Sequence, residues 1–235
     1  MCGRYASVTG VDPLVEIFGI DVPTFDSWPV RYNVAPTQQA PVVLRGLEGE
    51  RRLGTLRWGL IPSWAKEASI GSRMINARSE TVGAKPAFRE AFRARRCLVP
   101  IDFFYEWRKD DPENPKSPKT PFLIRPVSGN PFAVAGLWER WHGGEGGPLH
   151  TFTILTTSPS RWMSQLHDRM PVVLAPQDWD AWLSPDAEPE SLAGLFRPAP
   201  EDYFEAFEVS RAVNSPRNDV PQIAEPLPGG ERLRP

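Results

Sequence analysis

The chain has 235 residues and a formal net charge of −2, with nine Trp, twelve Phe and 27 Pro residues. Only two cysteines are present, without a CxxC motif or a Cys/His cluster, which excludes a disulfide framework and argues against a structural zinc site. No signal peptide or long apolar run occurs, so we expect a soluble cytoplasmic protein that makes no membrane contact. We expect no metal and no cofactor.

The chain opens with Met1-Cys2-Gly3-Arg4-Tyr5, which places a thiol directly after the initiator methionine. Methionine is readily removed before a small residue, so the mature chain is expected to begin at Cys2. That terminus carries an amine and a thiol on adjacent carbons, with ordinary pKa values of about 7.7–8.0 and about 8.5. An aldehyde can form a Schiff base with the amine and a thiazolidine with the thiol, or the thiol alone can attack a carbonyl. The alternative is an incidental cysteine on a fraying terminus.

The N-terminal half predicts short elements separated by proline-containing loops. We expect a helix at 12–18, with Asp12 as its N-cap and Gly19 after its last turn. The apolar loop between Trp58 and Trp64 either packs in the core or offers an aromatic platform to nucleic-acid bases. The other elements expected here are strands at 41–44 and 52–58 joined by a hairpin, a short strand within 74–81 and a helix at 86–96.

The most hydrophobic stretch, 97–107, is expected to be a central strand region. Glu106 lies within it between Tyr105 and Trp107, where a carboxylate is costly unless it is paired or used. Desolvation should raise the pKa of Glu106 and suit it to proton transfer near neutral pH. The alternative is a structural ion pair between Glu106 and a nearby arginine.

The C-terminal half predicts more strands than helices, after a polar loop at 110–120 that we expect to be mobile. The expected elements are strands at 121–126, 132–141, 149–156 and 204–209, a glycine-rich turn at 143–147, and short helices at 160–166, 176–183 and 192–196. The length permits two small domains, but no Gly/Ser-rich linker or internal repeat is found. We therefore predict one domain over 1–235, with its core at about 2–226 and a proline-rich tail. Its class is α+β, with mostly antiparallel strands in a barrel-like core flanked by short helices.

Three more polar residues stand where chemistry is plausible. His167 follows the predicted helix at 160–166 and is either a proton shuttle or a structural histidine. Asn76 and Arg78 alternate on a predicted strand, so their side chains should point to the same face. An amide there could orient a nucleophile, and a guanidinium could hold a phosphate.

Six motifs follow one another along the chain, and a seventh match lies near its end. They are Met1–Tyr5, Arg31–Pro36, Trp58–Pro62, Asn76–Thr81, Phe104–Trp107 and His167–Pro171, followed by Val209–Asn214. Together these motifs resemble the SOS-response-associated peptidase family, whose members shield abasic sites in single-stranded DNA. The resemblance extends from Met1 to about Pro226.

The resemblance implies a covalent chemistry centred on Cys2. Removal of Met1, by the chain's own peptidase activity or by a host enzyme, would expose Cys2, which crosslinks through sulfur and amine to the ring-opened aldehyde of an abasic deoxyribose. Asn76 would orient this terminus, and Glu106 would act as acid and base beside it and assist methionine removal. His167 would move protons on the sugar. The same Schiff base could lead to β-elimination, so a weak lyase activity is also implied.

The resemblance also implies contacts with a DNA strand. Arg78 would hold the phosphate at the lesion, with Arg4 as a further contact, and Trp58, Trp64 and Trp107 would border the path of the strand. Such phosphate contacts are independent of sequence and weaken steeply with salt. The expected partner is single-stranded DNA that contains abasic sites, bound by a monomer associated with the nucleoid on damaged DNA.

Two other classes of function remain open from the sequence. A terminal Met-Cys-Gly also begins the glutamine amidotransferases, in which the cysteine attacks an amide, and a glutaminase assay separates this class from the crosslinker. A non-covalent single-strand binder would leave Cys2 without a role. Denaturing electrophoresis separates that class, because only a covalent adduct survives it.

Overall fold

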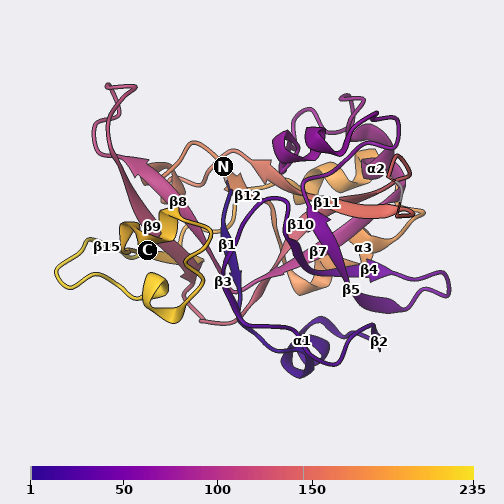
Figure 1. Ribbon diagram of the computed structural model, residues 1–235, viewed down its shortest axis with the longest axis horizontal. Helices are drawn as coiled ribbons and strands as arrows, with labels where there is room; N and C mark the ends of the chain where they lie inside the picture. Colours follow the sequence, from indigo (N-terminus) through magenta and orange to yellow (C-terminus); the bar gives the residue numbers. More distant parts are fainter. Residues whose placement is uncertain (1, 145) are drawn as a thin grey trace.

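Two β-sheets form the framework of the chain in the computed structural model, which describes residues 2–144 and 146–235. Figure 1 shows strand β1 near the middle of the molecule, with the C-terminal strands of its own sheet on the left and the larger second sheet on the right. The first sheet has the strand order β15 (Arg232–Leu233), β14 (Phe204–Glu208), β9 (Lys119–Pro126), β8 (Phe103–Lys109), β1 (Tyr5–Ser7) and β3 (Arg31–Val34).

The second sheet closes on itself into a five-stranded barrel. The ring consists of β4 (Gln39–Arg45), β5 (Arg51–Trp58), β11 (Leu149–Thr157), β10 (Phe132–Trp141) and β7 (Arg96–Ile101). Four of the five pairings are antiparallel, and the parallel pairing of β5 with β11 closes the ring. The predicted α+β class with a barrel-like core is therefore confirmed.

The remaining elements are short and flank this core. The strands are β2 (Val22–Pro23), β6 (Asn76–Arg78), β12 (Met170–Pro171) and β13 (Val173–Leu174). The α-helices are α1 (Val11–Phe18), α2 (Arg89–Ala94) and α3 (Trp179–Leu183). The 3₁₀ helices are η1 (Ala68–Arg73), η2 (Met163–Gln165), η3 (Pro176–Asp178), η4 (Pro189–Leu195), η5 (Arg211–Asn214) and η6 (Pro221–Ala224). No helix in the described part of the chain is long and apolar enough to cross a membrane.

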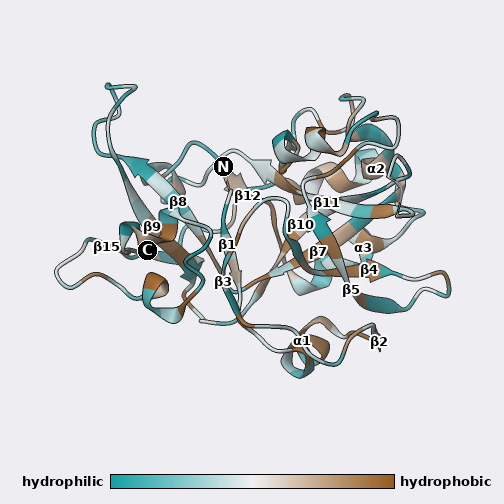
Figure 2. Cartoon of the chain, in the orientation of Figure 1, coloured by the Kyte–Doolittle hydropathy of each residue, from teal (hydrophilic) through white to brown (hydrophobic). Residues whose placement is uncertain are grey.

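Strand β7 shows why the barrel region of the sequence is so apolar. All six of its residues are buried, because one face points into the main core and the other is covered by α3 and α2. Cys97 and Val99 pack in the main core cluster, whereas Leu98 packs in the cluster on the opposite face. Figure 2 shows hydrophobic residues along the strands of the barrel and a hydrophilic end on the β8–β9 hairpin.

The apolar stretch 97–107 is not one strand but two strands in different sheets. Asp102 separates β7 from β8, and its carboxylate accepts hydrogen bonds from the N–H groups of Val8 and Thr9, at 2.7 and 3.2 Å, and from the Thr9 hydroxyl. These bonds satisfy the polar groups at the point where the chain leaves the barrel. The strand region predicted at 97–107 is thus present but divided between two sheets, a division that hydrophobicity alone does not reveal.

Two other boundaries also differ from the predictions. Helix α1 has Gly10, not Asp12, at its N-cap and no side-chain capping bond, although Gly19 ends it in the left-handed conformation (φ 57°) as predicted. The helix predicted at 86–96 is shorter, Arg89–Ala94. The predicted turn at 143–147 includes Glu145, which lies outside the described residues.

Trp58 belongs to the core, not to a DNA-facing surface. Its side chain has no exposed area, its Nε1 donates a hydrogen bond to the carbonyl of Ile75 at 2.9 Å, and its ring packs on Tyr5 and Phe152 with centroids 5.1 and 6.3 Å away. A ring enclosed in this way cannot stack on a base. The expectation that Trp58 borders a DNA strand is therefore corrected, whereas Trp64 is 60% exposed.

We predict that Trp58→Ala lowers the free energy of unfolding by about 3–5 kcal/mol, because it empties a fully buried site beside the closing strand pair. Urea denaturation measures the change. Trp64→Ala is the matched control and should stay within about 0.5 kcal/mol of wild type, because that side chain is exposed. Equal stabilities of the two variants would contradict the core assignment of Trp58.

Candidate functional site

The N-terminal residues reach the site through the register of β1 on β8. The two strands are antiparallel, with Tyr5 opposite Phe104, and the N–H of Tyr105 donates to the carbonyl of Arg4 at 3.0 Å. Continuing this register by two residues brings Gly3 alongside Glu106. Both residues line the same pocket. Local strand pairing therefore places the start of the chain beside the buried carboxylate.

Cys2 is held from its other side by Asn76. Strand β6 pairs in parallel with β11, and from it the Asn76 Nδ2 donates a hydrogen bond to the carbonyl of Cys2 at 2.9 Å. The Cys2 side chain has no exposed area and packs in the main core cluster. This burial, and next the nearby carboxylate of Glu106, raise the pKa of the Cys2 thiol. The thiol is therefore protonated near neutral pH.

Glu106 and His167 face one another across the pocket. The Nε2 of His167 lies 3.9 Å from the Oε2 of Glu106, whose side chain is only 3% exposed. Burial raises the pKa of Glu106 to about 7, as expected for a carboxyl group in an apolar strand. Burial also lowers the pKa of His167 to about 4. Near pH 7 the pair therefore consists of a partly protonated carboxyl group and a neutral imidazole.

Two neighbouring groups contact Nδ1 of His167. The N–H of Arg169 donates to Nδ1 of the ring at 3.0 Å, a contact that favours a proton on Nε2, the atom that faces Glu106. The Asp168 carboxylate lies 2.8 Å from Nδ1 and would accept its proton in the imidazolium form. The predicted acid–base residues are thus placed side by side and oriented.

The pocket is open to solvent and has a volume of about 540 Å³. It is lined by Gly3, Arg4, Glu106, Trp107, Lys119, His167 and Asn214. A second hollow of about 640 Å³ adjoins it and shares Trp107, Lys119 and His167. The two hollows meet at these shared residues beside Glu106, and together they are called the groove.

Arg4 forms part of the pocket wall and is held rigidly there. Its guanidinium donates to the side-chain oxygen of Asn33 and to the carbonyl of Val213, both at 2.9 Å, and lies over the Trp107 ring at 5.8 Å. The indole N–H of Trp107 donates to the Oδ1 of Asn214 at 2.7 Å. Burial lowers the pKa of Arg4. Arg4 and Trp107 therefore present a fixed cationic and aromatic surface.

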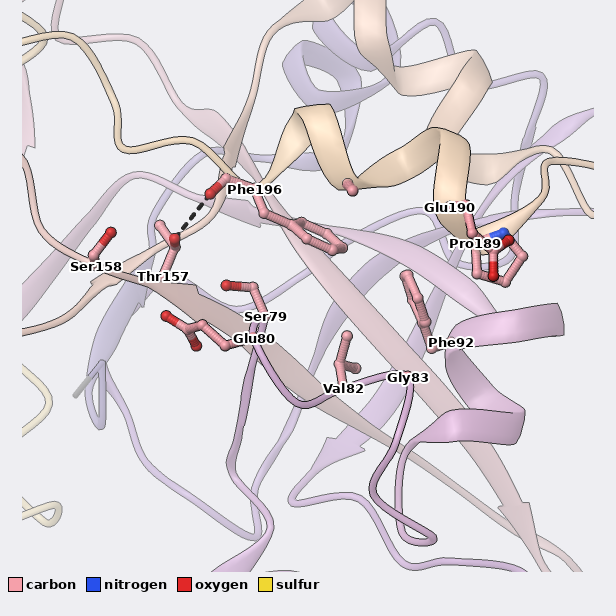
Figure 3. A pocket seen from close by; sticks show the side chains of 11 residues that line it. Ser79, Glu80, Val82, Gly83, Phe92, Thr157, Ser158, Pro189, Glu190 and Phe196 are labelled. Carbon is pink, nitrogen blue, oxygen red and sulfur yellow. Dashed lines mark hydrogen bonds between the residues drawn. The ribbon is translucent and has the colours of Figure 1, made fainter.

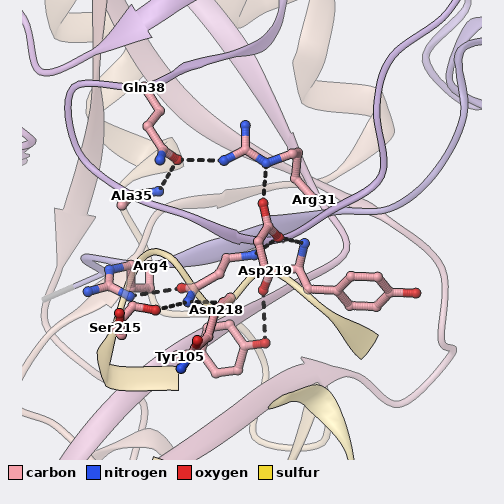
Figure 4. A network of polar contacts seen from close by, with 10 residues as sticks. Arg4, Arg31, Ala35, Gln38, Tyr105, Ser215, Asn218 and Asp219 are labelled. Atoms are coloured by element: carbon pink, nitrogen blue, oxygen red, sulfur yellow. Dashed lines mark hydrogen bonds and ion pairs between the residues drawn. The ribbon is translucent and has the colours of Figure 1, made fainter. Parts of the chain in front are cut away.

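Residues near the C-terminus hold this wall in place (Figure 4). The Asp219 carboxylate accepts hydrogen bonds from the N–H groups of Tyr32 and Asn33, at 2.6 and 2.9 Å, and pairs with Arg31. The Asn33 amide in turn donates to three carbonyls in the segment 213–218. The sequence analysis assigned no role to Asn33, Asn214, Asp219 or Lys119. Only the motifs at 31–36 and 209–214 pointed toward these segments.

Arg78 and Trp64 do not line the Glu106 pocket. Arg78 is exposed at the end of β6, two residues after Asn76. Its neighbour Glu80 pairs with Arg169 at 2.6 Å. The structure thus gathers Cys2, Asn76, Glu106, His167, Arg4 and Trp107 around one site and leaves Arg78 and Trp64 on the surface outside the pocket.

A separate hollow of about 610 Å³ lies beyond the end of β6 (Figure 3). Its walls carry Phe92 and Phe196, and Glu80 and Glu190 also line it. Its other polar groups are the hydroxyls of Ser79, Thr157 and Ser158, and none of the predicted site residues lines it. Across residues 2–144 and 146–235, no three His, Cys, Asp or Glu side chains are grouped to hold a metal ion.

The chain is similar to known proteins in sequence and in fold. The family model described as SOS response associated peptidase (SRAP) matches residues 1–216. The abasic site processing protein YoqW of Bacillus subtilis is 45% identical, over 96% of this chain and 99% of its own. The abasic site processing protein HMCES of Gallus gallus is 32% identical, over 83% of this chain and 66% of its own. A crystal structure from Bacteroides thetaiotaomicron shares the fold, with a TM-score of 0.81 and 24% identity, over 97% of this chain and 100% of that one.

The shifted pKa values of Glu106 and His167 should have opposite effects on how the free energy of unfolding changes with pH. Glu106 has a pKa of about 7 in the folded chain and an ordinary value of 4.5, so the folded state binds more protons between these values. Its contribution to stability therefore falls as pH rises from about 4.5 to about 7. His167 has a pKa of about 4 in the folded chain and an ordinary value of 6.5. Its contribution therefore rises as pH rises from about 4 to about 6.5.

We predict that single substitutions separate these two opposing contributions. In Glu106→Gln the histidine contribution remains, so stability should rise more steeply with pH than in wild type. In His167→Gln the carboxyl contribution remains, so stability should rise less or fall. Urea denaturation at a series of pH values between 4 and 7 measures both profiles, with Glu113→Gln on the exposed hairpin loop as control. If both variants showed the wild-type dependence of stability on pH, the shifted pKa values assigned to Glu106 and His167 would be wrong.

Proposed function

The chain belongs to the SOS response associated peptidase family, and we propose that it processes abasic sites in DNA by forming a covalent crosslink through Cys2. The abasic-site activity is suggested by the names of the relatives. The position of Cys2 is the observation that supports the covalent step. Its carbonyl accepts a hydrogen bond from Asn76, and the next residue, Gly3, lines the pocket of Glu106 and His167. This arrangement brings a nucleophile, an orienting amide and an acid–base pair together.

The proposed reaction begins with removal of Met1, which lies outside the described residues. The free amine of Cys2 attacks the aldehyde carbon of the ring-opened deoxyribose, and one water leaves as the imine forms. The thiol sulfur then adds to the imine carbon, and the thiol proton passes to the nitrogen to complete a five-membered thiazolidine. Because burial keeps the thiol protonated, the amine is the first nucleophile and the thiol closes the ring.

We assign the proton transfers to Glu106 and His167 according to their charge states. A carboxyl group with a pKa of about 7 exchanges protons readily near neutral pH, so Glu106 would relay the thiol proton during ring closure and assist removal of Met1. His167, whose pKa is lowered to about 4, would act as a neutral donor through Nε2–H toward the sugar oxygen. Its proposed role is therefore a hydrogen-bond donor rather than an imidazolium acid.

The partner in this proposal is single-stranded DNA. The pocket is open on the surface, and its wall offers the fixed Arg4 and Trp107 to a phosphate and a base. Arg78 lies exposed on the same strand as Asn76, where it would hold the phosphate next to the lesion. Trp64, also exposed, would border the strand. The imine intermediate would also permit weak β-elimination.

We predict that Cys2→Ala abolishes the denaturation-resistant complex with abasic single-stranded DNA but leaves non-covalent binding nearly unchanged. Both groups of the thiazolidine come from Cys2, and alanine keeps only the amine. Denaturing electrophoresis after incubation measures the yield. Cys97→Ala is the matched control, because it removes the other buried thiol and should crosslink like wild type. A wild-type yield from the Cys2 variant would rule out the proposed nucleophile.

We predict a separate electrostatic effect for Arg78→Gln. Loss of one phosphate contact should reduce the slope of log affinity against log salt concentration by about 0.7 for a single strand. Fluorescence anisotropy with undamaged oligonucleotides at several salt concentrations measures this slope. Arg93→Gln removes the same charge from exposed helix α2 and should leave the slope unchanged. Equal slopes for wild type and the Arg78 variant would instead assign Arg78 a structural role.

A further inference from the structure

The hairpin formed by β8 and β9 carries an unusual pair of charges. In its antiparallel register Lys109 lies directly opposite Lys119, so both side chains stand on the same face. Like charges in this position repel one another and destabilise the hairpin. Figure 1 shows that this hairpin projects away from the barrel. Packing of the barrel core therefore does not explain why two lysines stand opposite one another. An anion bound between the two ammonium groups would remove this repulsion.

Neighbouring carboxylates do not supply that anion. Among the residues that the structure describes, neither Lys109 nor Lys119 forms an ion pair, whereas the adjacent Arg108 pairs with Glu231. Asp110 accepts a hydrogen bond from the Thr120 hydroxyl at 2.7 Å and lies 3.8 Å from Arg211. Asp168, on the far side of the hollow, lies against Nδ1 of His167.

The two lysines also line the groove that leaves the Glu106 pocket. Both line the hollow of about 640 Å³, and Lys119 lines the adjoining pocket as well. Trp107 lies two residues before Lys109 on β8, so its ring stands on the same face. An aromatic ring followed by cations along a groove is the arrangement by which proteins bind a single strand, with a base on the ring and phosphates on the cations.

We propose that Lys109 and Lys119 form a second phosphate-binding subsite, which holds the DNA strand as it leaves the lesion through this hollow. The proposal rests on the proposed function, because it takes the strand at the Glu106 pocket as its starting point. An anionic phosphate between the two ammonium groups replaces their repulsion with attraction to both. The β8–β9 hairpin thereby extends the binding surface beyond Arg4, Trp107 and Arg78.

The test compares Lys109→Gln/Lys119→Gln with wild type, and Lys116→Gln serves as the control. Lys116 lies in the loop of the same hairpin, is exposed and lines neither hollow. For undamaged single strands, the double variant should show a salt slope smaller by about 0.7–1.4, corresponding to one or two lost phosphate contacts. The control should keep the wild-type slope. The double variant should also melt no earlier than wild type, because its opposed charges are gone.

A second arm locates the contacted phosphate. Each oligonucleotide carries one abasic site and one uncharged methylphosphonate linkage, and the linkage is moved stepwise along either flank of the site. Initial binding of each oligonucleotide is measured for the Cys2→Ala chain and for the same chain with both lysine substitutions. We expect the uncharged linkage to weaken binding by the chain that keeps its lysines at one or two positions on one side of the lesion. At the same positions it should not change binding by the chain in which both lysines are replaced. Equal effects at every linkage, or an unchanged salt slope, would overturn the subsite. Failure of the wild-type chain to crosslink would instead overturn the proposed function and leave this comparison standing.

Discussion

The antiparallel pairing of β1 with β8 is the constraint on which the site depends. It places the start of the chain inside a six-stranded sheet, between β8 and β3, and brings Gly3 alongside Glu106. The bond from the Asn76 amide to the Cys2 carbonyl holds the same segment from the barrel side. A terminus that usually frays is therefore fixed from two sheets at once. The proposed reaction of the Cys2 amine and thiol with a DNA aldehyde requires such positioning.

Burial then sets the chemistry of the groups around this terminus. It disfavours the charged forms of the thiol, the carboxyl group and the imidazole alike, so Cys2 and His167 are neutral and Glu106 is near its midpoint at neutral pH. In the proposed reaction the carboxyl group is therefore the residue that exchanges protons, and the histidine is a hydrogen-bond donor. A protonated thiol agrees with the proposed order, in which the amine attacks before the thiol.

Much of the fold follows from local sequence patterns, whereas the site depends on long-range contacts. The hairpin β4–β5, the strands β9, β10 and β11 and the raised pKa of Glu106 were all predictable, because periodicity and an apolar context are local signals. Trp58 was misjudged because an aromatic residue beside a loop reads equally well as a platform or as core. The charge state of His167 could not be predicted, since its burial comes from elements distant in the chain.

The residues of the pocket wall were missed for the same reason. Asp219 contacts β3 across more than 180 positions of sequence, and Asn214 reaches Trp107 across 107. Lys119 looks like an ordinary loop lysine until its register opposite Lys109 is known. Strand register is a tertiary property, and a shift of one residue would turn either side chain to the other face.

Intact-mass spectrometry of the chain before and after incubation with an abasic single strand tests the central claim most directly. The account predicts that the chain lacking Met1 gains the mass of the oligonucleotide minus one water, and that borohydride, which reduces imines, does not change this product. An adduct that borohydride reduces would show an imine in which the thiol takes no part. A mass unchanged by the abasic strand would contradict the covalent function altogether.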